Sequence, residues 1–248
     1  SYDFLAARDT NIWFDYIGGI LGIGFMVAGY GTNVAHELTH RTKNKISMLE
    51  GRWLLSTSCN ADFAIEHVYG HHVHVGTDKD PATAKKGENV YMFALRSSIF
   101  GHISAWKHEL KRLQKKKISI FSIRNRMITG YIMSIFWCVI FYIACGPFGL
   151  VLFLCQAAIA KFILEIVNYM EHYGLTRKEG QPIGPEHSWN SNHRMSTMIL
   201  FTLTRHSAHH EKPKAEFWKL DPYADAPKMP YGYLGTLIFC LIPFLWYR

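Results

Sequence analysis

Residues 31–45 read GTNVAHELTHRTKNK, where an uncharged apolar run gives way to a basic segment. Within this stretch, His36 to His40 form the pattern H-E-x-x-H, which in zinc proteases supplies two zinc ligands and a glutamate general base. Residues i and i+4 of a helix lie on one face, so His36 and His40 can point at the same metal ion. The stretch therefore predicts a metal site at the end of an apolar helix, whose other ligands lie elsewhere in the chain.

Long apolar runs flank this site and others like it. Spanning a bilayer takes about 20 apolar residues in a helix, and three runs are long enough to be predicted as spans: 16–35, 127–145 and 148–169. Gly146 and Pro147 break the second run from the third, and Lys161 and Glu165 interrupt the third near its end. The tail 233–247 is apolar but short, and is expected to be a re-entrant or interfacial piece or the start of a span.

The composition agrees with a membrane protein that carries a polar cap. The mean hydropathy of −0.01 alone is typical of a soluble chain, but the apolar residues, 49% of the total, gather in the runs above. A net charge of +8 can indicate a nucleic-acid partner; in a membrane protein it more often marks loops that face anionic lipid. We expect membrane lipid and no nucleic acid as a partner. The five cysteines form no C-x-x-C pair, so no disulfide framework or thiolate metal site is predicted.

Basic residues set the expected topology. They follow the first span, fill the run 107–117 before the second, and follow the third at Arg177 and Lys178. By the positive-inside rule these segments lie in the cytoplasm. All histidine-rich segments then fall on one side of the membrane. The sequence therefore predicts an all-α integral membrane helical bundle with a cytoplasmic, histidine-rich cap, as a single domain over 1–248.

Eight histidines occur in three clusters with the spacing of chelating residues on a helix: His36, His40, His67, His71, His72, His206, His209 and His210. A catalytic zinc takes three protein ligands, so a zinc-protease site would leave five or six of these histidines unused. Two metal ions with about four imidazoles each would use them all. Imidazole suits iron, zinc and copper alike. A site beside apolar helices favours redox chemistry on a lipid-soluble substrate, and zinc is redox-silent.

Four motifs carry a family resemblance: HELTHR at 36–41, EHVYGHH at 66–72, NYMEHYGL at 168–175 and LTRHSAHHE at 203–211. They resemble the motifs of the membrane-bound alkane 1-monooxygenases, which are related to xylene monooxygenase and to membrane fatty-acid desaturases and hydroxylases. The resemblance implies a non-haem site of two iron ions and makes the eight clustered histidines ligands. It adds a ninth, His172 of NYMEHYGL, and no catalytic residue beyond the ligands.

The same resemblance implies an activity and partners. An n-alkane from the bilayer would be hydroxylated with O₂ at its terminal methyl group, giving a primary alcohol. Rubredoxin and rubredoxin reductase would supply electrons, with the basic run 107–117 as a docking surface, and the chain would lie in a bacterial inner membrane. Thr204 and Glu211 depart from residues more usual in the family. The family has further spanning helices before its first cluster, so we expect N-terminal transmembrane helices to be missing from this sequence.

Several alternatives stay open on the sequence alone. A xylene-type hydroxylase or a fatty-acyl desaturase would use the same scaffold, and a membrane zinc metalloprotease or a metal transporter would explain part of the pattern. Five histidines outside the motifs are expected to have loop, interface or supporting roles: His74, His102, His108, His187 and His193. One or two nearby acids are expected to accept a hydrogen bond from a ligand histidine: Asp62, Glu66, Asp78 or Glu171.

Overall fold

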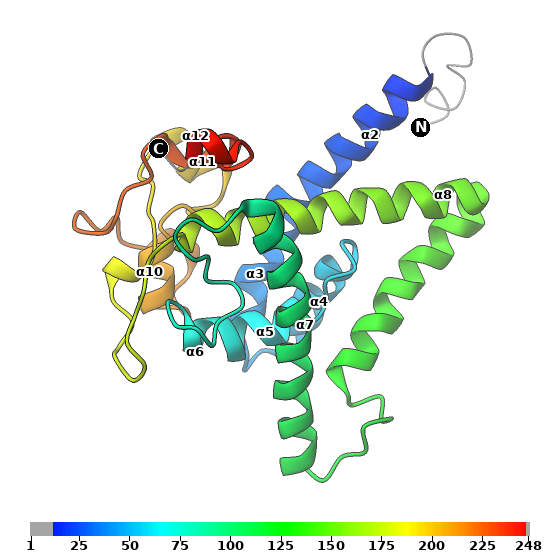
Figure 1. The fold of residues 1–248 in the computed structure, drawn as a ribbon. Coiled ribbons are helices and arrows are strands. Elements are labelled where there is room, and N and C mark those ends of the chain that lie inside the picture. Colours follow the sequence, from blue (N-terminus) through cyan, green and yellow to red (C-terminus); the bar gives the residue numbers. More distant parts are fainter. Residues whose placement is uncertain (1–11, 247–248) are drawn as a thin grey trace.

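The computed structural model describes residues 12–246, which fold into helices around a compact cap from which long helical arms extend (Figure 1). Within that range there is no β-strand; a single isolated bridge pairs Asn190 with Lys228. The expected all-α architecture is confirmed. The cap lies at one end of the arms, and its interior holds the histidine motifs.

The first arm is one helical column made of three segments. It runs through α2 (Ile12–Met26), the π-helical η1 (Val27–Thr32) and α3 (Asn33–Thr39). The predicted span 16–35 thus continues to Thr39, because no breaker lies between the apolar run and HELTH. His36 therefore sits on a continuous helix, and His40 caps its end. The side chain of Asn44 then accepts two backbone N–H groups and starts α4 (Lys45–Ser56).

The second and third predicted spans form the two arms of one kinked element, α8 (Arg126–His172). Helical geometry is lost at Cys145 and Gly146, where Gly146 has a φ of 65° that glycine adopts without strain. Pro147 follows, as is typical at the start of a new helix. Figure 1 shows the two arms of α8 meeting at a tip far from the cap. The returning arm ends at His172, inside the cap.

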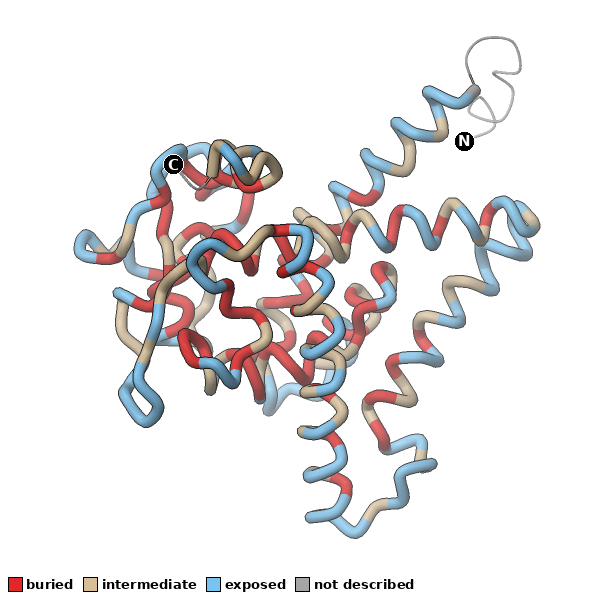
Figure 2. The backbone as a smooth tube through the Cα atoms, in the orientation of Figure 1, coloured by how far each residue is buried: buried red, intermediate tan, exposed pale blue. Residues whose placement is uncertain are grey.

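The arms are apolar and exposed, which distinguishes them from the core helices of a soluble protein. Trp13–Thr39 and Arg126–His172 are long and apolar enough to cross a membrane. Only 17% and 11% of the residues in their most apolar 18-residue stretches are buried. Figure 2 shows buried residues concentrated in the cap and exposed residues along the arms. Exposed apolar surface of this extent is expected where lipid, not water, is the solvent. The two helices indicate a membrane protein.

Helix α7 (Val90–Lys115) was not predicted as an element, because its apolar residues are interspersed with charged ones. It leads from the cap to the basic run and packs against α5 and α8. The buried carboxylate of Glu109, on α7, lies 2.5 Å from Arg112 of the same helix and 2.7 Å from Arg126, the first residue of α8. The contact with Arg126 joins the end of α7 to the start of α8. Several apolar side chains of α7, such as Leu95 and Phe100, are more than half exposed.

The cap consists of short helical pieces joined by loops: α5 (Phe63–Glu66), η2 (His67–His71), α6 (His72–His74), η3 (Pro185–His187), α9 (Arg194–Ile199), α10 (His206–Glu211), η4 (Phe217–Lys219), α11 (Gly232–Cys240) and α12 (Pro243–Trp246). The apolar tail forms α11 and α12, which are too short to span a bilayer. Tyr247, the last residue of that predicted tail, lies outside the described range.

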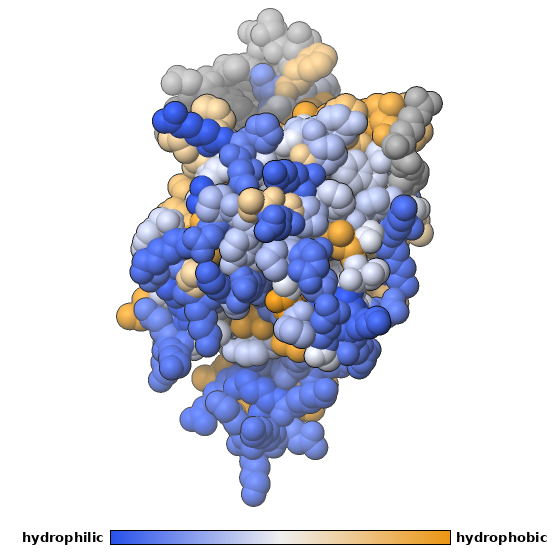
Figure 3. Space-filling model, turned by 90° about the vertical axis from the view of Figure 1, so that its left-hand side faces the viewer, coloured by the Kyte–Doolittle hydropathy of each residue, from blue (hydrophilic) through white to orange (hydrophobic). Residues whose placement is uncertain are grey.

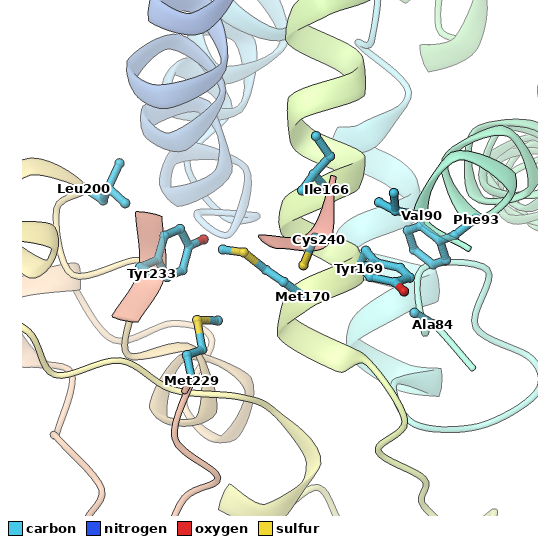
Figure 4. Close-up of a cluster of buried hydrophobic side chains, with 10 residues drawn as sticks. All are labelled: Ala84, Val90, Phe93, Ile166, Tyr169, Met170, Leu200, Met229, Tyr233 and Cys240. Atoms are coloured by element: carbon cyan, nitrogen blue, oxygen red, sulfur yellow. The ribbon is translucent and has the colours of Figure 1, made fainter. Parts of the chain in front are cut away.

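An apolar cluster holds the tail and the spanning arm together (Figure 4). Tyr169 and Met170 of α8 pack with Phe93 of α7 and with Tyr233 and Cys240 of α11. These side chains are at most 2% exposed. Because Tyr169 and Met170 precede His172 by one helical turn or less, this packing fixes the position at which His172 enters the cap.

Candidate metal centre

Five histidines converge to form the first group, which we call group one: His36, His40, His67, His72 and His209. Their candidate ligand atoms all lie within 4.8 Å of one another. Neighbouring Nε2 atoms are 2.9 Å apart between His36 and His209, 3.0 Å between His67 and His72, and 3.1 Å between His40 and His67. The group joins the end of the first arm to two segments of the cap.

Four histidines form a second group beside it, which we call group two: His71, His172, His206 and His210. The Nε2 atoms are 2.9 Å apart between His206 and His210, 3.1 Å between His172 and His206, and 3.2 Å between His71 and His210. His172 is fully buried and brings the returning arm of α8 into the centre. The two groups together contain all nine histidines that the sequence analysis named as metal ligands.

Neighbouring histidines of one motif divide between the groups. In the second motif, His67 and His71 fall in different groups although they are four residues apart. The reason is that η2 (His67–His71) is π-helical, so positions five apart come to lie over one another. His67 and His72 therefore share group one, and His71 turns to group two.

The third cluster divides in another way. On α10, His206 and His210 are one turn apart and both belong to group two. His209 lies next to His210, but successive α-helical side chains point about 100° apart, so it reaches group one. The two groups are thus adjacent, and the rings of His72 and His210 stack with centroids 4.3 Å apart.

The donor set fits two metal ions. With a metal–nitrogen distance of about 2.1 Å, nitrogens at 90° around one ion lie about 3.0 Å apart, which matches the Nε2 separations in both groups. A metal ligand must also be the neutral imidazole. Burial holds the pKa well below 6.5 for six of the imidazoles: His40, His67, His72, His206, His209 and His210.

Two acceptors outside the groups orient ligand rings. Asp80, a buried residue, approaches Nδ1 of His71 at 2.8 Å with its Oδ2 atom. The hydroxyl of Thr83 donates to the same Oδ2 atom at 2.5 Å. Although burial alone would raise it, the pKa of Asp80 lies below its usual value because of His71 and Thr83. Nδ1 of His172 faces the carbonyl oxygen of His187 at 3.3 Å. Both contacts leave Nε2 free for a metal.

The prediction that one or two of Asp62, Glu66, Asp78 and Glu171 would take this role was wrong, because none of them accepts a hydrogen bond from Nδ1 of a ligand histidine. Asp62 pairs with Nδ1 of His102, which belongs to neither group, and Asp78 pairs with Lys85 at the surface. Asp80 takes the role instead. Sequence gave little signal for it, because nine residues separate it from His71 and only the loop after α6 brings it back.

The other two acids lie inside the centre without accepting a hydrogen bond from an Nδ1 atom. Oε1 of Glu171 accepts the hydroxyl of Tyr233 at 2.8 Å, and its Oε2 lies 3.2 Å from the metal-facing Nε2 of His206. Because of this second contact, Glu171 is placed to contact whatever group two binds. Burial raises the pKa of Glu66 to about 8.

The glutamate of H-E-x-x-H is directed elsewhere. Glu37 forms an ion pair with Arg41, one turn along the same segment, and is partly exposed. A protease would need this carboxylate to activate water at the metal. The pairing with Arg41, and the five-histidine group that contains His36 and His40, do not match that arrangement.

An apolar pocket lies against both groups. It is reached by His36 and His67 of group one and by His206 of group two, and Glu171 forms part of its wall. Its other walls come from the first arm, the returning arm of α8, the end of α9 and α11, through side chains such as Phe25, Ala28, Ile163, Leu164, Val167, Leu200, Leu234 and Leu237. The pocket therefore connects the metal centre with the segments that are apolar enough to lie in a membrane.

The histidines that were expected to have supporting roles lie outside both groups. His187 orients His172 through its carbonyl oxygen, and His102 pairs with Asp62. His193 directly precedes α9. Its ring packs against the backbone at Gly232, so closely that a Cβ atom added there would lie 3.1 Å from it. His74 and His108 line a polar groove on the outside of the cap.

Comparison with known proteins gives consistent results. A model of the fatty acid desaturase family matches residues 11–239. The chain is 41% identical, over 98% of its length, to alkane 1-monooxygenase 1 of Pseudomonas aeruginosa, and 37% identical, over 93%, to alkane 1-monooxygenase 2 of Alcanivorax borkumensis. It is 29% identical, over 93% of its length, to the hydroxylase component of a xylene/toluene monooxygenase of Pseudomonas putida. The chain spans 64%, 61% and 62% of the lengths of these relatives.

Proposed function

The chain belongs to the fatty acid desaturase family, and from this premise we propose that it is a membrane monooxygenase that hydroxylates the terminal methyl group of n-alkanes. The observation that carries the proposal is the pair of adjacent histidine groups at the inner end of an apolar pocket. Relatives named alkane 1-monooxygenases support the choice of substrate.

The two histidine groups are proposed to hold one iron ion each. Group one supplies five imidazoles and group two supplies four, and both sets consist of buried or half-buried rings. When bound, iron would supply the redox chemistry that lets O₂ attack an unactivated C–H bond, a role that redox-silent zinc cannot fill. All nine histidines are then ligands, His172 included. Asp80 and the His187 carbonyl hold two of these rings in the orientation that directs Nε2 inward.

The apolar pocket is proposed to position the alkane. Its side chains can hold an extended hydrocarbon chain only by shape, so the end of the chain, not its middle, meets the histidine groups. The same apolar walls keep bulk water away from the reacting carbon. Glu171, fixed by Tyr233, is one of the few polar groups on this wall and marks the inner end of the pocket.

Electrons are proposed to come from rubredoxin, an acidic carrier, which is reduced by its own reductase. A groove on the outside of the cap is lined by basic side chains from three segments: Lys79, Lys85, Lys86, Lys107, Lys111 and Arg177. Asp80 lies in the same groove and contacts His71 of group two. Figure 3 shows the hydrophilic face of the cap that points away from the arms. Electrostatic attraction would guide an acidic protein to such a groove.

The positions of basic residues support a bacterial inner membrane location with the metal centre toward the cytoplasm. Lysines and arginines follow the first arm, fill the run 107–117 before α8 and follow the returning arm of α8, whereas the tip of α8 at residues 146–147 carries none. This distribution is the one that the positive-inside rule associates with the cytoplasmic side.

Product analysis tests the proposal. The iron-loaded chain, with reduced rubredoxin, rubredoxin reductase, O₂ and octane, is expected to form 1-octanol. Xylene and a fatty-acyl substrate serve as parallel reactions. Oxidation of xylene alone, or an alkene from the acyl chain without any octanol, would replace the proposal by one of the two related activities. Absence of any oxygenated product from a chain that holds iron would contradict it.

A further inference from the structure

The returning arm of α8 contains an ion pair that the proposed function does not use. Nζ of Lys161 lies 2.6 Å from Oε1 of Glu165, and the Glu165 side chain is only 3% exposed. Ionisable residues in a spanning segment are costly, face protein or a water-filled cavity rather than lipid, and commonly belong to a functional pathway. The question is what this pair faces.

Both residues line a second cavity, on another side of the metal centre. Its lining is polar where that of the alkane pocket is apolar. Asp62 and His102 lie on its wall, together with His67 of group one and His71 of group two. A polar cavity with about 30 Å³ open to the centres of water-sized spheres has room for about one or two water molecules, each of which needs two to four polar partners.

A row of hydrogen bonds joins this cavity to the surface of the protein. Oδ2 of Asp62 lies 2.8 Å from Nδ1 of His102, and Nε2 of His102 lies 2.8 Å from the hydroxyl of Tyr131. The exposed fraction of the side chain rises from 16% for Asp62 to 41% for His102. Glu66 and Lys161 line the same cavity as Asp62. The Asp62 carboxylate raises the pKa of His102, so this imidazole can take up a proton from the surface.

Alkane hydroxylation requires such a route. One oxygen atom of O₂ enters the C–H bond and the other leaves as water, which consumes two electrons from the carrier and two protons from solvent. The apolar pocket holds the alkane and offers few groups that can pass a proton. Protons therefore need an entrance that the substrate does not fill.

We propose that the polar cavity is the proton-uptake route of the metal centre, with His102 and Asp62 as its entrance and the Lys161–Glu165 pair as its inner relay. The proposal rests on the proposed monooxygenase function. It assigns Asp62 and Glu165 to proton delivery rather than to metal binding, since neither residue is in a histidine group.

The test uses Asp62→Asn and Glu165→Gln in the full chain, with Asp225→Asn, an exposed residue of the C-terminal segment, as the matched control. Three quantities are measured: iron per chain, octanol formed per two electrons consumed, and the solvent isotope effect in D₂O. We expect unchanged iron in all three variants. In Asp62→Asn and Glu165→Gln, octanol formation should fall by about 100-fold or more, hydrogen peroxide should replace part of the product, and the isotope effect should rise. Asp225→Asn should match the parent.

Parent-like coupling and isotope effect in both cavity variants, at full iron content, would overturn the inference. If Asp62→Asn loses iron, His102→Gln at the exposed end decides the matter, because parent-like behaviour of that variant would overturn it equally. A parent chain that makes no octanol would instead contradict the proposed function itself, so the two failures are distinguishable.

Discussion

At the scale of single residues, His172 illustrates how much the sequence could reveal. It stands alone in NYMEHYGL, without a partner at i+3 or i+4, so spacing could not identify it as a ligand and only the family resemblance did. In the structure it is fully buried, its Nε2 faces His206, and its Nδ1 faces the His187 carbonyl. A ligand histidine usually donates one ring N–H to an acceptor and directs the other nitrogen at the metal, and the buried His172 ring has this arrangement.

Replacing His172 should therefore lower the iron content more than replacing a histidine outside the two groups. His172→Ala is expected to lose a substantial part of the iron of group two and nearly all octane hydroxylation, because one of four imidazoles disappears. His193→Ala, outside both groups, should retain both. Iron analysis and octanol yield measure the difference. Full iron and activity in both variants would make His172 a structural residue.

Asp80 is the residue that the sequence analysis missed. Its carboxylate orients the His71 ring, and partners of this kind typically change metal affinity 10-fold to 100-fold. Asp80→Asn should weaken iron binding by a factor in that range, because an amide accepts the Nδ1 hydrogen less strongly. The exposed Asp78, two residues earlier, provides the control Asp78→Asn. Iron retention during chelator titration measures both, and equal retention would remove the orienting role from Asp80.

At the scale of elements, the apolar runs predicted the arms well and the local helix geometry less well. Uncharged runs of about 20 residues leave a chain little choice in lipid, where every backbone group must be paired within the helix. The π-helical turn at His67–His71 lies inside the cap, where a Cβ atom at Gly70 would clash with the Glu66 carboxylate, and no periodicity in the sequence announces it. The i, i+4 rule therefore predicted the right histidines but could not predict how they divide between the two groups.

Helix α7 was not predicted, although the sequence analysis singled out the basic run 107–117 at its end. Figure 1 shows it running from the cap to the loop before α8, and the corresponding lower end of Figure 3 is strongly hydrophilic. Lys107 and Lys111 lie one turn apart on α7 and line the basic groove. Their positions make α7 the element on which the proposed docking of the carrier can be tested.

Reversing these two charges should weaken carrier binding without changing the metal centre. Lys107→Glu with Lys111→Glu is expected to raise the KM for rubredoxin several-fold at low ionic strength, and the effect should shrink as salt increases above about 0.1 M. Lys228→Glu, outside the groove, is the control. Steady-state rates at two salt concentrations, with iron content held equal, measure the effect. An unchanged KM in the double variant would move the docking site elsewhere.

At the scale of the whole molecule, the cap is the part that sequence predicted least. Residues 175–231 contain no long periodic run, and their short helices acquire positions from contacts with the arms and with one another. Bringing nine imidazoles together also has a cost, since buried neutral histidines must stay unprotonated. The fold of the cap and the occupancy of its metal centre are therefore expected to be coupled.

The cost should be visible as acid sensitivity of the metal-free protein. Burial lowers the pKa of His67, His72, His206, His209 and His210 in the folded state below the usual 6.5. Below pH 6.5 the unfolded chain binds protons that the folded chain does not. The free energy of unfolding therefore decreases as the pH is lowered, by up to about 1.4 kcal/mol per pH unit for each histidine. Thermal unfolding of the iron-free chain between pH 8 and 5 measures this. A Tm independent of pH would contradict it.

The central claim is that the two histidine groups hold two iron ions, and the metal content of an active preparation tests it most directly. Elemental analysis of the purified chain, taken from the same sample that forms octanol, is expected to give about two irons per chain and little zinc, because group one and group two each complete one site. One zinc per chain with no iron, in a sample that is active, would contradict the account.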